Sequence, residues 1–321
     1  MAKKNTFTKK ELETLSPEKI IDKIQHENYS LLTTLGGEKL RKEMVPVGKA
    51  CHFFLRRFYN GAKKGKNEAE HIRNVQQNVV KTLRRLAPAN YDEKMFPKDS
   101  KDGVVIGFNH PSLGEILRIL MMKIDIMGDK PMLFPVNLPW YESIAKDYDD
   151  LKKIGIIITP TITPSTWKKL NIAEDNKFFE SATKIKKDFR NIYTDLSNKT
   201  IKEGGAIFVA PSATRQATVF KTKAVYDKKE DIIPTMSVLA IKLYADKDMR
   251  CNFMPLAVIP PKNYKRGLNL FKKYKLVPGD IMTTDYIRKT YFKEKNPKRL
   301  DGFDYDFHER IAKKLPKEFW Y

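Results

Sequence analysis

Short apolar runs separated by helical stretches characterise the chain from about residue 96 onward. Runs of four to eight apolar residues that alternate with helices are typical of strands buried between flanking helices. The pattern therefore predicts an α/β fold with a mixed, largely parallel sheet flanked by helices. The runs lie at residues 103–108 (GVVIGF), 131–136 (PMLFPV), 154–159 (IGIIIT), 205–210 (GAIFVA) and 251–259 (CNFMPLAVI).

The chain before these runs has helical periodicity instead. Ser16 is a predicted N-cap, Pro17 takes the first helical position, and apolar residues then recur at helical spacing. Residues 70–86 repeat this signal, and prolines interrupt it afterwards. We expect residues 1–95 to form a smaller N-terminal helical domain that precedes an α/β domain over residues 96–321.

The composition indicates a globular and strongly basic protein. Hydrophobic residues make up 41% of the chain, which argues against disorder, and 61 Lys+Arg against 39 Asp+Glu give a net charge of +22. Such a charge attracts anionic partners such as nucleic acid, anionic lipid, phosphorylated metabolites or acidic carrier proteins, without choosing between them. Cys51 and Cys251 have no zinc-ligand or disulfide-framework spacing, which favours a cytoplasmic location, and no apolar stretch is long enough for a membrane span.

Polar residues with catalytic or binding chemistry cluster around three of the five runs. In open α/β sheets, functional groups gather where strands end and loops begin. The first run is followed by Asn109, His110 and Glu115, the fourth by Pro211, Ser212, Thr214 and Arg215, and the fifth ends in residues 255–259 (PLAVI).

His110 and Glu115 have the chemistry of a general base and its orienting carboxylate. An imidazole with an ordinary pKa of about 6.5 is largely neutral near pH 7, and a carboxylate on the second ring nitrogen fixes its tautomer. If Pro111 opens a helix, His110 occupies the N-cap and Glu115 lies one turn inside. The alternative is that His110 only caps the helix and Glu115 is a first-turn acid that suits the helix dipole.

The three blocks, in this order and spacing, resemble the glycerolipid acyltransferase superfamily. Its members carry N-H-x-x-x-x-D, then P-E-G-T-R, then V-P-V-A-I. Asn109-His110 with Glu115, residues 211–215 (PSATR) and residues 255–259 (PLAVI) match these blocks, and Glu115 replaces the usual Asp. The stretch FVAPSATR is most similar to the soluble, plastid-type glycerol-3-phosphate acyltransferases, which read A-P-S-G-G-R and also have a helical domain before the α/β domain.

The resemblance implies transfer of a fatty acyl group from a thioester donor to the hydroxyl of glycerol 3-phosphate. The donor is an acyl carrier protein or coenzyme A, and lysophosphatidic acid is the alternative acceptor. His110 is then the base, Glu115 orients it, and no metal or cofactor is implied. Arg215 offers a planar fork of donors to the acceptor phosphate. Asn109, Ser212 and Thr214 complete the expected substrate-binding set, although Ser212 and Thr214 suit turn formation equally well.

Two hypotheses of other classes stay open. A basic nucleic-acid-binding protein would explain the net charge, but the chain has no recognised nucleic-acid-binding signature, which argues against such a partner. A catalytically inactive, lipid-binding relative would explain Glu115. Residues 51–66 mix aromatics with five cationic residues and suit either an amphipathic helix packed on its own domain or peripheral contact with an anionic membrane.

Overall fold

The computed structural model describes residues 4–92, 94, 102–109, 114–172, 176–210, 235–262, 269–294, 297–298 and 300–316. The chain divides into two compact units, each made of two segments that are distant in sequence. Unit 1 comprises Met1–Gly61 and Leu133–Leu196, and unit 2 comprises Ala62–Met132 and Ser197–Tyr321. This division does not test whether residues 1–95 or residues 96–321 fold independently, so that domain boundary stays a prediction.

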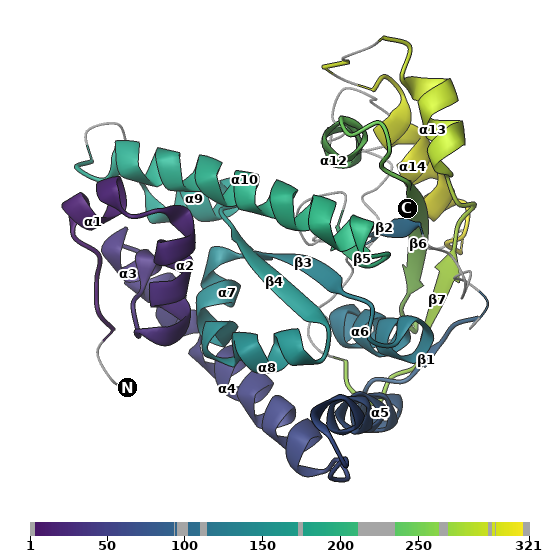
Figure 1. Ribbon diagram of the computed structural model, residues 1–321, viewed down its shortest axis with the longest axis horizontal. Coiled ribbons are helices and arrows are strands. Elements are labelled where there is room, and N and C mark those ends of the chain that lie inside the picture. The colour runs from purple at the N-terminus through teal and green to yellow at the C-terminus, as the bar shows by residue number, and fades with distance from the viewer. Residues whose placement is uncertain are drawn as a thin grey trace. The chain divides into compact units, whose positions relative to one another are not determined.

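Unit 1 is mainly helical, with two neighbouring strands (Figure 1). The predicted start of its second helix is confirmed, because the Ser16 hydroxyl accepts a hydrogen bond from the backbone N–H of Lys19 at 3.3 Å, and Pro17 follows at the first helical position. The elements are α1 (Lys9–Thr14), α2 (Pro17–His26), α3 (Leu31–Thr34), α4 (Glu38–Asn60), β3 (Met132–Asn137), α7 (Leu138–Ile144), η2 (Ala145–Asp147), α8 (Tyr148–Lys153), β4 (Ile156–Thr161), α9 (Pro164–Leu170) and α10 (Phe179–Lys202), whose last residues belong to unit 2.

Close packing and one buried carboxylate hold unit 1 together. A Cβ at Gly48 of α4 would lie 2.2 Å from the carbonyl oxygen of Ser143, so only glycine allows α4 and α7 to approach this closely. The Glu142 carboxylate accepts hydrogen bonds from the Ser30 hydroxyl at 2.7 Å and the Leu32 N–H at 2.8 Å. Burial raises the pKa of Glu142, and these donors oppose that shift.

Unit 2 contains a five-stranded part of the sheet, in the order β1-β7-β6-β2-β5. All neighbouring pairs are parallel except β6 with β7. The α/β class and the mixed, largely parallel sheet flanked by helices are therefore confirmed. The elements are α5 (Glu68–Leu86), β1 (Ala89–Asn90), β2 (Gly103–Phe108), α6 (Gly114–Met127), β5 (Ala206–Val209), α12 (Thr235–Tyr244), β6 (Cys251–Ile259), β7 (Tyr274–Pro278), α13 (Thr284–Tyr291) and α14 (Phe303–Ala312).

Helices α12 and α14 cover one face of the central strand β2. Gly107 makes this possible, because a Cβ there would lie 2.3 Å from the Phe307 ring of α14 and 3.1 Å from Met236 of α12. The buried carboxylate of Asp304 in α14 accepts hydrogen bonds from the N–H groups of Met236 at 2.8 Å and Ser237 at 3.2 Å. This carboxylate therefore satisfies first-turn donors of α12 and complements its dipole.

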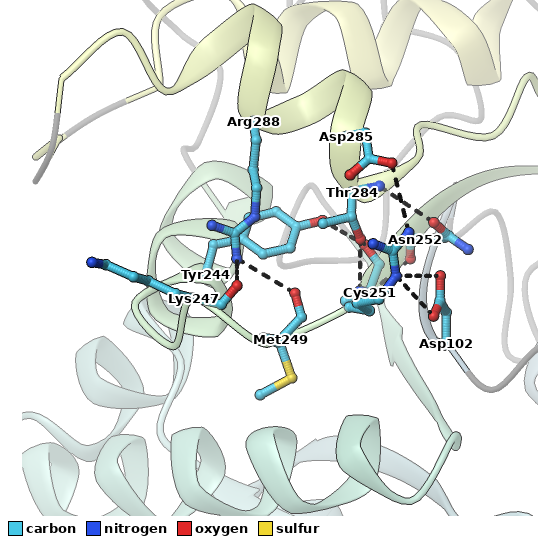
Figure 2. Close-up of polar contacts among 10 residues, drawn as sticks. Asp102, Tyr244, Lys247, Met249, Cys251, Asn252, Thr284, Asp285 and Arg288 are labelled. Carbon is cyan, nitrogen blue, oxygen red and sulfur yellow. Dashed lines mark hydrogen bonds and ion pairs between the residues drawn. The ribbon is translucent and has the colours of Figure 1, made fainter.

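Polar contacts fix the amino end of β6, at the edge of the sheet away from Asn109 (Figure 2). The Thr284 hydroxyl accepts from the Cys251 N–H at 2.8 Å and donates to the Cys251 carbonyl at 2.9 Å. The Arg288 guanidinium donates to the carbonyl oxygens of Asp246 and Lys247 after α12 and lies 5.0 Å from the centre of the Tyr244 ring. Among the described helices, none has both the length and the apolar character needed to cross a bilayer.

Candidate functional site

The strands associated with the three sequence blocks are neighbours. Strand β2 lies between β5 and β6, and Gly107 is paired with Val209 on one side and Pro255 on the other. All three strands are parallel, so their carboxyl ends reach the same edge of the sheet. That edge is where open α/β sheets carry their functional groups.

Asn109 follows β2 directly and connects it to β6. Its side-chain N–H donates to the Val258 carbonyl at 2.9 Å, and its side-chain oxygen accepts from the Val258 N–H at 2.6 Å. The residue is only 8% exposed, so both contacts are shielded from water. Asn109 thus has a structural contact within the site, and its predicted role in substrate binding stays a prediction.

Glu115 lies in the first turn of α6, and its side chain is fully buried. A carboxylate in such a position requires compensating charge or hydrogen bonds. Arg118, one turn later on the same helix, is also fully buried and supplies a nearby positive charge. Burial lowers the pKa of the Arg118 guanidinium, while Tyr274 and the Glu115 carboxylate oppose that shift. The predicted orienting carboxylate therefore lies in a buried, charge-compensated environment.

Arg118 also connects α6 with the edge of the sheet. Its guanidinium lies 3.9 Å from the centre of the Tyr274 ring, a cation–π contact. Its acceptors include four backbone carbonyls, which a planar fork of donors can engage simultaneously. These acceptors are the carbonyl oxygens of Gly114 at 2.6 Å, Lys272 at 2.6 Å, Asn269 at 2.8 Å and Pro88 at 3.2 Å.

The segment at residues 269–273 presents an aromatic side chain beside the same edge. Phe271 is 72% exposed and has a φ of +62°, and Asn269 has a φ of +44°. Left-handed backbone is unfavourable for a residue with a Cβ, so the contacts of this segment must hold it there. Lys275, near the start of β7, pairs with Ile259 at the carboxyl end of β6. The sequence carries no signal for Arg118 or Phe271, because neither belongs to a motif.

The remaining predicted site residues, His110, Ser212, Thr214 and Arg215, lie outside the described residues. Of the predicted site residues, the structure therefore describes Asn109, directly after β2, and Glu115, in the first turn of α6, and it places β5 and β6 beside β2. Within the described part of the chain, no group of three or more His, Cys, Asp or Glu side chains is arranged to hold a metal ion.

No family profile matches the chain, and no curated protein sequence matches it. The residues of the site are therefore the basis for assigning a function.

Proposed function

We propose that the protein is an acyltransferase that moves a fatty acyl group from a thioester to the hydroxyl of glycerol 3-phosphate. The observation that carries this proposal is the adjacency of β5, β2 and β6, whose parallel carboxyl ends meet at one edge. A buried carboxylate in the first turn of the helix after β2, that of Glu115, supports the same proposal. The match of three blocks to a known order supports the same activity.

In the proposed reaction, His110 removes the hydroxyl proton as the oxygen attacks the thioester carbonyl. The new ester C–O bond forms, the C–S bond breaks, and the proton held by the imidazole passes to the departing thiolate. Glu115 stabilises the transient imidazolium, and Arg118 acts through Glu115 as a positioning residue. Arg215 binds the acceptor phosphate together with Ser212 and Thr214. Asn109, immediately before His110 in the sequence, keeps the end of β2 paired with β6.

The decisive experiment measures the acyl transfer directly. Purified protein is incubated with radiolabelled glycerol 3-phosphate and either acyl-coenzyme A or acyl carrier protein thioester, and organic-extractable label is counted. We expect label from the wild type and a loss of at least about a hundredfold in His110→Ala, the scale of a general base. Glu115→Gln removes the charge at constant volume and should also lower the rate, with a changed pH profile.

His26→Ala serves as the matched control, because His26 is half exposed on α2 in unit 1. It should transfer acyl groups at the wild-type rate. Equal yields from the wild type and His110→Ala would remove His110 from the mechanism. Lysophosphatidic acid tested as acceptor in parallel decides between the two acceptors. Strong, salt-sensitive retention on nucleic acid without acyl transfer would favour the rival class instead.

We also propose peripheral contact with anionic membrane through one face of α4. Lys49, Phe53, Arg56 and Arg57 are exposed on this helix, and Phe53 is 60% exposed. Each cation near an anionic surface contributes about 1 kcal/mol to binding. Arg56→Glu with Arg57→Glu should reduce sedimentation with anionic vesicles, whereas neutral vesicles should retain neither protein. Unchanged binding of the double variant would exclude this face.

A further inference from the structure

A groove on unit 2 lies between α5 and the carboxyl end of α6. Its volume is about 720 Å³, within the range of about 300–1,000 Å³ typical of small-molecule sites. Cationic, amide and apolar side chains of α5 form one wall, and the end of α6 with the residues after it forms the other. The lining residues are Arg73, Gln76, Gln77, Val80, Lys81, Arg84, Arg85, Ile124, Asp125, Gly128 and Asp129.

The two acidic residues of the groove are compensated by their own neighbours. Asp125 accepts hydrogen bonds from Arg84 at 2.7 Å and from the Tyr91 hydroxyl at 2.6 Å. Asp129 interacts with Lys123, which is fully buried and donates to the Gly128 carbonyl at 2.8 Å. Burial lowers the pKa of Lys123 to about 8, and Asp129 opposes that shift.

The remaining cations of the groove determine the sign of its charge. Of the residues the structure describes, no carboxylate lies within 4.0 Å of the charged groups of Arg73, Lys81 or Arg85. These side chains are exposed. The groove therefore offers uncompensated positive charge along one wall, which favours an anionic ligand.

The cations are spread along the groove with less polar surface between them. Arg73 and Arg85 lie about 18 Å apart along the axis of α5, at about 1.5 Å per residue. Gln76 and Val80 lie between these two arginines on α5, and Ile124 lies on the opposite wall, on α6. This arrangement fits an extended ligand that carries anionic groups at separate points and a flat or apolar part in between.

The groove and the candidate site share helix α6. Ile124 lies about 14 Å beyond Glu115 along this helix, at about 1.5 Å per residue. A pantetheine arm is a long, flexible chain that separates phosphates from a thioester. A donor held by its phosphates in the groove can therefore extend its thioester along α6 toward Glu115.

We infer that the groove binds the phosphate-bearing adenosine end of a coenzyme A thioester, which makes coenzyme A the acyl donor. This inference rests on the proposed function. A small ligand suits the groove better than an acidic carrier protein, because a stable protein interface buries about 800 Å² on each partner rather than filling a pocket. Lys81 and Arg85 hold phosphate oxygens, and Arg73 holds the more distant anionic group.

Calorimetric titration of the full chain tests this inference without turnover. The probes are coenzyme A, adenosine 3′,5′-bisphosphate, pantetheine, inorganic phosphate and holo acyl carrier protein. We expect coenzyme A and the bisphosphate to compete for one site and pantetheine to bind poorly. Lys81→Ala with Arg85→Ala should weaken both by at least about tenfold, because charge-assisted contacts are lost. Lys289→Ala, an exposed lysine of α13, is the matched control and should bind like the wild type.

Three outcomes would overturn the inference. These are wild-type affinity for coenzyme A in the double variant, binding of the carrier protein but not of coenzyme A, and equal affinity for inorganic phosphate and the bisphosphate. An unchanged melting temperature of the double variant confirms that these exposed substitutions leave the fold intact.

The test also separates this inference from the proposed function. Coenzyme A binding that depends on the groove residues, without any acyl transfer, would support the groove as a coenzyme A site and contradict the proposed acyltransferase activity. Acyl transfer from acyl-coenzyme A with an unchanged KM in the double variant would support the acyltransferase and exclude the groove as the donor site. His110→Ala should bind coenzyme A like the wild type.

Discussion

Asn109 and Val258 are joined by two hydrogen bonds, in which a side-chain amide takes the place of a strand backbone. The distances are 2.9 Å to the Val258 carbonyl and 2.6 Å from its N–H. Strand β2 ends at Phe108, so the asparagine extends its pairing with β6 by one residue. The chain therefore leaves the sheet from a fixed point immediately before His110.

Asn109→Ala should lower the free energy of unfolding by about 2 kcal/mol, because both buried backbone groups of Val258 lose their partner. Asn109→Asp retains the acceptor but places an oxygen against the Val258 carbonyl, so it should also destabilise. Urea denaturation measures both. Asn60→Ala, exposed at the end of α4, should change stability by less than about 0.5 kcal/mol. A stable Asn109→Ala protein with weakened acceptor binding would instead support the substrate-binding role.

Replacement of Arg118 should be more damaging. Arg118→Met fills the volume but leaves carbonyl oxygens of Gly114, Asn269 and Lys272 without this donor, at a cost of about 3 kcal/mol. Arg118→Lys should recover only part of this, because an ammonium cannot reproduce the planar fork over Tyr274. Thermal unfolding measures the loss.

Hydrogen exchange locates the effect of the Arg118 variants. Protection should fall at the Phe271 and Tyr274 amides, which donate to the Leu86 and Pro88 carbonyls. Full recovery of stability by lysine would show that charge, rather than the fork of donors, is what the position requires.

Phe271→Gly should stabilise the protein or leave it unchanged, with a gain of up to about 1 kcal/mol, because glycine adopts the left-handed φ of +62° without strain. The exposed ring loses little burial when it is removed. The matched control is Phe53→Gly, at an exposed phenylalanine inside α4, which should destabilise by about 1 kcal/mol. Destabilisation by both variants would mean that the Phe271 ring makes a stabilising contact.

His308 should make stability depend on pH in the acidic range. Burial lowers the pKa of this α14 histidine from 6.5 to about 4, so between these values the unfolded chain binds a proton that the folded chain does not. The stabilisation from neutral His308 is complete above pH 6.5 and is lost as the pH falls toward 4, by about 3 kcal/mol in total. His308→Gln should lack this component.

Urea unfolding of wild type and His308→Gln at several pH values between 4 and 7 measures the difference, in which the contributions of other groups cancel. Parallel pH dependences of the two proteins would contradict the prediction.

Patterns within short stretches of sequence predicted much of the sheet. All five apolar runs form strands, and the run at residues 251–259 coincides with Cys251–Ile259. Strand β7 was missed because it is short and its buried Tyr274 and Leu276 alternate with Lys275 in a basic segment. Strand β1 has only two residues, Ala89 and Asn90, which is too short for any periodicity.

The candidate site was predictable only where a motif marks it. Asn109 and Glu115 were named by their place after a strand, and the structure describes both. Arg118 could not be found this way, because its partners include carbonyl oxygens from two distant segments, and backbone groups leave no mark in the sequence. The groove along α5 was not predictable from sequence either, since Arg73 and Arg85 line a groove only because α6 forms its opposite wall.

The two-segment construction of each unit has a consequence for biosynthesis. As the chain emerges from a ribosome, the helices at Met1–Gly61 lack the later half of their unit until Leu133–Leu196 has followed. Unit 2 can be completed only later, because the carboxylate that caps α12 belongs to Asp304, near the end of the described chain. Nascent chains should therefore expose apolar helix faces for much of translation.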